Sequence, residues 1–257
     1  MPVTVFAPSE DGKTHGNFAD ESYAGMCERP GWMARFAKVH TQAARSLPKV
    51  DRRWRELDSS MSSDALLMNV FCYPGVASSA SVIGMLGLED AHEPEYGVKA
   101  KVPLANGRFD RTEVDMRLGP LLVEAKLTES DFQCRDMEIV KGYRDFEDVF
   151  QKGLLPKVDR KYAGYQLIRN VLAAHATGSS FCVMHDARRP DLREQWYEVM
   201  QAVKIGDLRT RCKVLTWQEL SAVLPEGLQE FLDGKYGIVP PGRTGSAVLE
   251  NDSGDHF

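Results

Sequence analysis

The stretch "EVDMRLGPLLVEAK", residues 113–126, constrains the fold more than any other part of this chain. Apolar and polar residues alternate along both of its halves, which is the period of a β-strand. The pair Gly119-Pro120 stands between the halves, and glycine at the first central position suits a type II′ turn. The stretch therefore predicts a two-stranded hairpin, and any symmetric loop about this pair gives the same register.

The predicted register sorts the hairpin side chains onto two faces, because successive side chains of a strand point in opposite directions. One face is an apolar stripe: Val114, Met116, Leu118, Leu121, Val123 and Ala125. The other face holds Leu122 and the charged residues Glu113, Asp115, Arg117, Glu124 and Lys126. The apolar stripe predicts the buried face, so we expect the protein to present the charged one.

Two carboxylates oppose each other on the charged face. The register sets Asp115 opposite Glu124, with Cβ atoms about 4.5–5.5 Å apart, where like charges are destabilising unless a cation joins them. A hard divalent ion with oxygen ligands would do so. Lys126 points the same way and could hold an attacking water or neutralise charge in a transition state. The alternative is a solvated polar face with Glu113 and Lys126 as a cross-strand ion pair.

The rest of the chain predicts a mixed sheet with helices on both faces. Strands that follow one another directly favour antiparallel pairing, whereas strands separated by helices favour parallel pairing. The expected strands span 96–104, 111–118, 121–128, 179–186 and 211–217. The expected helices span 31–48, 62–75, 132–151, 159–178, 190–203 and 217–224. The fold class is therefore α/β, with a mixed α+β sheet.

Composition along the chain predicts three regions. Residues 1–30 are rich in Gly, Ser, Asp and Pro, which indicates an irregular N-terminal arm. Residues 31–237 carry the helical and strand periods of a single domain. Residues 238–257 lack a core to bury and predict a loose C-terminal tail.

Charge and cysteine usage narrow the function classes. The net charge of −5 argues mildly against a general nucleic-acid binder. Yet the segment from Arg35 to Arg55 holds seven basic residues and one acid, so it is either a solvated helix face or a surface that faces phosphate. The five cysteines lack C-x-x-C spacing, which argues against zinc and disulfides. No apolar run suits a membrane helix and no signal-peptide pattern is present, so we expect a cytoplasmic protein without membrane partners.

The order of elements resembles the PD-(D/E)XK nuclease superfamily, the restriction-endonuclease-like fold. That superfamily has an αβββαβ core, and the elements expected from Ser62 to Val183 follow this order, with extra N-terminal and C-terminal helices. The segments "HGNFADESY", "SSDALLMNVF" and "TWQELSAVLPEGLQEFLDGKYG" resemble sequences of a bacterial branch of nucleases in this superfamily. The resemblance covers most of the chain from His15 to Gly237.

The superfamily motif is an acid on the second strand followed by Glu-x-Lys on the third. Asp115 matches the acid, and the run Glu124-Ala125-Lys126 matches Glu-x-Lys. Gln166 stands where RecB-like members carry a glutamine on the next helix. The chain departs at Val114, where the name-giving proline is absent, and at Asn170, where the RecB-like pattern has tyrosine. Neither departure removes a metal ligand.

The resemblance implies a role for each matching residue. Asp115, Glu124 and the carbonyl of Ala125 would bind Mg²⁺ or Mn²⁺, and Lys126 would be the catalytic lysine. Gln166 would complete the catalytic set by orienting the site or contacting substrate. Glu113 is a candidate second-metal ligand, and Asp64 a further acid or only a partner of its helix dipole. The residues expected to contact the nucleic-acid backbone are Arg35, Lys38, Arg45, Arg52, Arg53 and Arg169.

The function that follows is a metal-dependent nuclease acting on DNA, as a hydrolase of phosphodiester bonds. Two alternatives remain open: a nuclease fold that serves only as a binding or assembly module, and a phosphodiesterase for a smaller substrate. A nuclease that cuts both strands is often a dimer, so a homodimer is one further expectation. Strand preference, sequence specificity, endo or exo action and the pathway do not follow from these residues.

Overall fold

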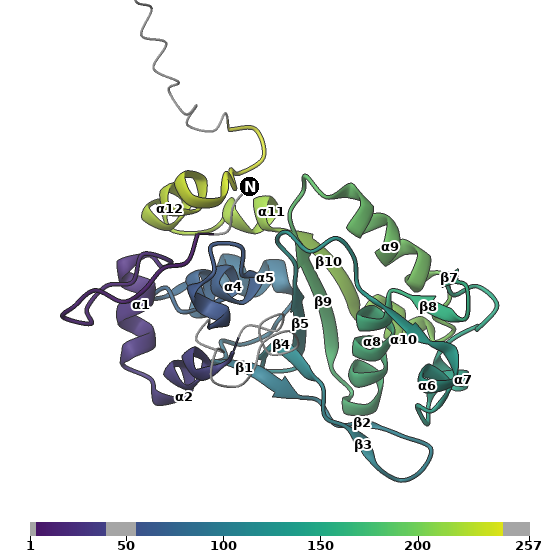
Figure 1. The fold of residues 1–257 in the computed structure, drawn as a ribbon. Coiled ribbons are helices and arrows are strands. Elements are labelled where there is room, and N and C mark those ends of the chain that lie inside the picture. The colour runs from purple at the N-terminus through teal and green to yellow at the C-terminus, as the bar shows by residue number, and fades with distance from the viewer. Residues whose placement is uncertain (1–3, 40–54, 244–257) are drawn as a thin grey trace, which may run out of the picture.

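The computed structural model, which describes residues 4–39 and 55–243, has a five-stranded mixed sheet at its centre (Figure 1). The strand order is β1-β4-β5-β9-β10, with the bounds Pro94–Lys99, Glu113–Leu118, Leu121–Ala125, Ser180–His185 and Cys212–Thr216. β1, β4 and β5 are antiparallel neighbours, whereas β5, β9 and β10 are parallel. The predicted mixed sheet, with antiparallel strands first and parallel strands later, is confirmed.

Helices cover both faces of the sheet (Figure 1). One face packs against α6, α7, α8, α9 and α10, with the bounds Met137–Lys141, Phe146–Val149, Tyr165–Thr177, Pro190–Met200 and Gly206–Thr210. The other face packs against α4, α5, α11 and α12, with the bounds Ser63–Phe71, Ala80–Leu86, Trp217–Ser221 and Glu226–Tyr236. The sheet therefore buries apolar side chains on both sides, as a layered α/β fold requires.

The order α4-β1-β4-β5-α8-β9 is the predicted αβββαβ core. The predicted N-cap of α4, the first helix of this core, is present, because Ser62 Oγ accepts from the Ala65 N–H at 3.1 Å. The predicted capping box is also present, since Thr216 and Glu219 exchange side-chain and backbone hydrogen bonds at the start of α11. No helix within the described ranges is long and apolar enough to cross a membrane.

The prediction of an irregular arm over residues 1–30 is wrong from Asp20 onward, whereas residues 4–19 contain no helix or strand beyond isolated β-bridges. The segment forms the helix α1 (Asp20–Cys27) and the start of α2 (Pro30–Met33). Its aromatic and apolar side chains pack against α4 in a cluster of their own that includes Phe18, Tyr23 and Met26. Two of the residues that indicated a loop belong to the packed helix: Ser22 Oγ donates to the Asn69 carbonyl at 2.7 Å, and Gly25 is buried against Cys72.

The helix predicted from 31 to 48 is shorter than its apolar period suggested. α2 continues into the 3₁₀ turn η1 (Ala34–Ala37), and Lys38 is already extended with ψ 119°. Val39 then forms a β-bridge with Arg55. Residues 40–54, with the predicted contacts Arg45, Arg52 and Arg53, lie outside the described residues.

The helix predicted from 159 to 178 begins only at Tyr165. Gly164 has φ +69°, a left-handed conformation that does not continue an α-helix. The preceding residues form β7 (Lys157–Val158) and β8 (Lys161–Ala163). β8 pairs with β7 on one side and with β6 (Cys134–Asp136) on the other, in a small sheet. Tyr162 fell on the helical stripe by spacing alone, and it is buried from a strand instead.

Other boundaries also differ from the predictions. The helix expected over 132–151 divides into β6, α6 and α7. The strand expected over 96–104 divides into β1 and β2 (Val102–Pro103), and β2 pairs with β3 (Phe109–Asp110) in a separate hairpin. The tail prediction is wrong for Ile238, which is fully buried against the α12 side of the sheet, while residues 244–257 lie outside the described ones.

The turn between β4 and β5 gives a test of the fold. Gly119 has φ +56°, and a Cβ at this position would collide with the His92 ring. We expect Gly119→Ala to lower the free energy of unfolding by about 1–3 kcal/mol, because strain and collision add. In a His92→Ala background the same substitution should cost less, since only the backbone strain remains. Urea denaturation of the four proteins measures this; equal losses in both backgrounds would contradict the collision.

Candidate active site

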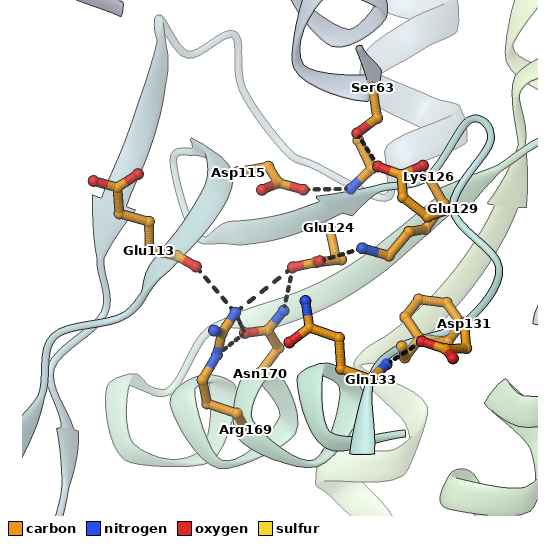
Figure 2. A network of polar contacts seen from close by, with 12 residues as sticks. Ser63, Glu113, Asp115, Glu124, Lys126, Glu129, Asp131, Gln133, Arg169 and Asn170 are labelled. Atoms are coloured by element: carbon orange, nitrogen blue, oxygen red, sulfur yellow. Dashed lines mark hydrogen bonds and ion pairs between the residues drawn. The ribbon is translucent and has the colours of Figure 1, made fainter. Parts of the chain in front are cut away.

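The β4–β5 hairpin forms in the predicted register. Leu118 pairs with Leu121 and Met116 with Val123. One residue beyond, the Asp115 carboxylate takes the place of a backbone acceptor, because its Oδ2 accepts from the Ala125 N–H at 2.8 Å (Figure 2). The polar face of the hairpin is only partly presented to solvent, unlike the prediction. α8 covers β5, all of which is buried, whereas the Glu113 and Arg117 side chains on β4 are 39% and 44% exposed.

Asp115 is held in a position that disfavours its charge. Burial raises its pKa well above the ordinary value, and the nearby charges of Glu124 and Asp64 raise it further. The Ala125 N–H and the Lys126 ammonium favour the carboxylate but do not offset these effects. No hydrogen bond or ion pair within the described part of the chain reaches Oδ1, the second oxygen. Asp115 is therefore the strained member of the predicted carboxylate pair.

Glu124 is more deeply buried than Asp115 but well compensated. Its side chain is 1% exposed, and burial alone would raise its pKa. The Lys126 ammonium at 2.9 Å from Oε1 and the Arg169 guanidinium at 3.7 Å from Oε2 outweigh burial and lower the pKa below its ordinary value. Asn170 Nδ2 also donates to Oε2 at 2.8 Å. Glu124 is therefore a fixed anion.

Lys126 is a fixed cation. Its side chain is 5% exposed, and burial alone would lower its pKa, but Glu124 and Asp115 together raise it above the ordinary value. The ammonium lies 5.5 Å from the centre of the Phe132 ring, and the Lys126 carbonyl accepts from the Trp217 indole at 2.8 Å. A lysine held in this way stays protonated at neutral pH. It can donate hydrogen bonds and stabilise negative charge, but it does not act as a proton-accepting base.

Glu113 lies apart from the predicted pair. Its Oε2 accepts from Arg35 Nη1 at 2.8 Å, so it is not the ion-pair partner of Lys126. Figure 2 shows its carboxylate pointing away from Asp115 and Glu124. Arg35 reaches Glu113 over Gly97, which has φ +63° and where any Cβ would collide with the guanidinium. The geometry therefore does not favour Glu113 as a ligand to the same metal ion as Asp115.

Arg35 and Lys38 serve an internal anion rather than an open surface. Arg35 Nη2 and Lys38 Nζ each lie 2.8 Å from Asp64 Oδ2, and the side chains of Arg35 and Asp64 are each 8% exposed. Asp64 is thus the centre of an ion cluster beside Asp115. The sequence left open whether it was an extra acid of the site or a partner of its helix dipole. Burial would raise the pKa of Asp64, but Lys38 and Arg35 lower it.

The polar residues of α8 complete the site in a way the sequence only partly indicated. Gln166 lies one turn before Asn170, so both belong to one face of the helix. Asn170 holds Glu124, whereas Gln166 Oε1 is buried without a hydrogen-bond partner among the described residues. Arg169, predicted to contact substrate, is buried and donates to the Glu113 carbonyl and to Asn170. The helical period from Gln166 to Asn170 was the signal that could have found Asn170.

The donor set fits a hard divalent cation. Mg²⁺ typically takes one or two carboxylates and completes its shell with water and substrate oxygens. Asp115 and Glu124 supply two carboxylates, and a cation between them would remove the repulsion that raises the Asp115 pKa. No group of three or more Asp, Glu, His or Cys residues in the described ranges could hold a metal ion, so any ion here depends on this pair and on backbone or water oxygens.

The pKa of Asp115 predicts how stability depends on pH. A carboxyl group whose pKa is raised by folding stabilises the protein at low pH, and this contribution is lost as pH rises through the folded-state pKa. Asp115→Asn keeps an acceptor for the Ala125 N–H without the charge. In EDTA, the variant should therefore be more stable than the parent at pH 8, by roughly 1.4 kcal/mol for each pKa unit of the shift, with a smaller difference at pH 5.

Asp186 supplies the control of opposite sign. Burial would raise its pKa, but hydrogen bonds from Arg188 and Gln218 lower it. Its charge therefore stabilises the fold above the unfolded-state pKa, and Asp186→Asn should be destabilising at pH 8. Urea denaturation at both pH values measures both variants. An Asp115→Asn protein that is less stable than the parent at pH 8 would show that the carboxylate is not strained.

Comparison with known proteins assigns the chain to a family. No curated protein and no solved structure matches it. Residues 4–237 match the family described as "Restriction Endonuclease associating with ARP" (REase-ARP). This range contains the whole sheet, the carboxylate pair and α8. Together with the αβββαβ core, the match places the chain among restriction-endonuclease-like proteins, and it belongs to the REase-ARP family.

Proposed function

We propose that this protein is a Mg²⁺- or Mn²⁺-dependent nuclease that hydrolyses phosphodiester bonds in DNA. Family membership indicates a nuclease. The observation that carries the finer proposal is the pair of half-buried Asp115 and buried Glu124 next to a protonated lysine, Lys126. A polar site of this kind is costly in a hydrophobic core, and a function at the site explains why the fold contains it.

Asp115, Glu124 and the carbonyl of Ala125 would hold the metal ion. Asp115 would contribute chiefly Oδ1, because Oδ2 already accepts from the Ala125 N–H. Glu124 is kept ionised by Lys126 and oriented by Asn170, so no proton has to leave it before it binds a cation. When bound, the ion would supply Lewis-acid stabilisation of charge on a phosphoryl oxygen and a lowered pKa for a coordinated water.

Lys126 would act on the charge that develops during hydrolysis. Its ammonium carries three donors, and one of them is engaged by Glu124 at 2.9 Å. The remaining donors can orient a water or contact an oxygen of the scissile phosphate. Because its pKa is raised, the residue keeps its positive charge throughout. We assign it electrostatic stabilisation and water positioning rather than general-base catalysis.

Gln166 would assist by hydrogen bonding. Its buried Oε1 has no partner in the part of the chain that the structure describes, which leaves it available to a water or a substrate group. Asn170, one turn later, would be a positioning residue because it acts on Glu124 and not on substrate.

We further propose a single metal ion. The acids that could hold a second ion are already neutralised, since Arg35 bridges Asp64 and Glu113 at 2.8 Å to each. A guanidinium in this place supplies part of the positive charge that a second cation would bring. Glu113, expected at first as a second-metal ligand, would then be an anchor for Arg35.

A specific observation favours one alternative, a fold that binds or assembles without cutting. Both oxygens of Glu124 already have partners, so this carboxylate is satisfied without a metal ion. Calorimetry with Mn²⁺ separates the two proposals. The nuclease proposal requires that the parent protein binds Mn²⁺ and that Asp115→Asn abolishes this binding, whereas the alternative expects no Mn²⁺ binding by either protein. The family description also names association with ARP, which fits either proposal. The predicted homodimer and the smaller phosphodiester substrate stay predictions.

The nuclease proposal predicts the behaviour of plasmid DNA in Mg²⁺ or Mn²⁺. Asp115→Asn and Lys126→Gln should each lower the cleavage rate by about 100-fold or more, as removal of one preorganised charge-stabilising group typically does. Arg117→Gln is the matched control, because Arg117 lies on the same strand but forms an exposed ion pair with Glu95. Parent protein that leaves the plasmid intact with either ion, or variants that cut like the parent, would overturn the proposal.

A further inference from the structure

The distribution of unpaired cations is uneven on this acidic protein. Most Lys and Arg side chains that the structure describes form an ion pair or a hydrogen bond. Apart from Arg209, the exposed ones without either gather in two segments, 99–111 and 135–161. Of the basic patch expected from the sequence, Arg35 and Lys38 are committed to Asp64, and residues 40–54 lie outside the described ranges. Among the described residues, the unpaired positive charge therefore lies chiefly in these two segments.

The first segment leads directly into the catalytic strand. It contributes the exposed cations Lys99, Lys101, Arg108 and Arg111. Its one acid, Asp110, accepts from the hydroxyls of Tyr143 and Thr112 and forms no ion pair with any of these cations. Phe109, between the two arginines in sequence, is 53% exposed on β3.

The unpaired cations of the second segment, residues 135–161, lie on the small sheet β6-β8-β7 and in the turn between β7 and β8. They are the exposed side chains of Arg135, Lys157, Arg160 and Lys161. Val158 is also 53% exposed, next to these charges. Like the first segment, the second segment thus combines unpaired positive charge with an uncovered apolar side chain.

A chain of contacts connects both segments to the candidate active site. The Arg135 guanidinium lies 5.6 Å from the Tyr165 ring centre, and the Tyr165 hydroxyl lies 2.9 Å from that of Tyr143, which donates to Asp110. Tyr165 is the first residue of α8, and β2 also packs against this helix (Figure 1). α8 carries Asn170, which binds Glu124. The two basic segments therefore meet at the helix that supports the site.

The loop before β6 brings the second segment to the same place. The Phe132 and Gln133 carbonyls accept from the Gln166 and Tyr165 N–H groups at 2.9 Å each. Phe132 lies against Lys126, and Figure 2 shows the Gln133 side chain pointing toward Glu124 and Asn170. On the other side, Arg111 is two residues before Glu113 at the start of β4.

We propose that these two segments form the surface that holds the DNA backbone beside the scissile phosphate. The inference rests on the proposed function for the identity of the substrate, and it locates where that substrate lies. Unpaired Lys and Arg side chains neutralise phosphates and release counterions, which supplies most of the affinity for DNA. Exposed Phe109 among arginines would offer a stacking surface to an unpaired base, the contact that single-strand binders combine with cations. This arrangement favours DNA over an acidic protein as the occupant.

The test is binding of a short labelled DNA duplex by fluorescence anisotropy in EDTA, so that no cleavage is needed. Arg108→Gln/Arg111→Gln and Lys157→Gln/Lys161→Gln should each weaken binding about tenfold or more at low salt. Each should reduce the slope of log Kobs against log salt by about 0.9 for every phosphate that the protein no longer neutralises. Arg209→Gln, an exposed unpaired cation on α10, is the matched control and should change neither quantity.

The outcomes separate this inference from the nuclease proposal. If the parent binds the duplex and the two double variants lose affinity and salt dependence, the surface is assigned even if the protein cuts nothing. If the protein cuts DNA but both double variants bind like the parent, the inference falls and the nuclease proposal stands. Polyglutamate that competes as well as unlabelled duplex of equal charge would assign the surface to an acidic protein partner and overturn the inference.

Discussion

The rest of the site depends on one unfavourable interaction, two carboxylates brought together in a buried hairpin. The β4–β5 register fixes Asp115 beside the Glu-Ala-Lys run, where Glu124 is fully buried and Asp115 is half-buried. Glu124 is compensated by Lys126, Asn170 and Arg169, whereas Asp115 keeps a raised pKa. A site with one satisfied and one strained acid is prepared to accept a cation.

A separate cluster of charged side chains lies beside that pair. Arg35 and Lys38 hold Asp64, and Arg35 also holds Glu113, so these acids form an ion cluster of their own. The cluster ties the N-terminal segment to β4 and to the start of α4. It also leaves Asp115 and Glu124 as the two acids that a single metal ion would join. The fold of the N-terminal region and the chemistry of the site are thus linked through one arginine.

The sequence predicted what depends on local information and missed what depends on tertiary contacts. The hairpin register follows from alternation and from Gly119-Pro120, which are neighbours in the chain, so both the register and the mixed sheet are confirmed. The partner of Glu113 was not predictable in this way, because Arg35 is 78 residues away. The segment around Tyr162 misled because strand and helix spacings coincide there. Whether a surface cation is paired also depends on the fold, so the basic segments beside α8 could not be recognised from composition.

The most direct test of the central claim is a crystal of the parent protein soaked in Mn²⁺ and measured at the manganese absorption edge. We expect one anomalous peak per chain, within about 2.0–2.4 Å of oxygens from Asp115, Glu124 and the Ala125 carbonyl. The same soak of Asp115→Asn crystals should show no peak at this place. Absence of the peak in the parent, or a peak bound by Glu113 and Asp64 instead, would contradict the account.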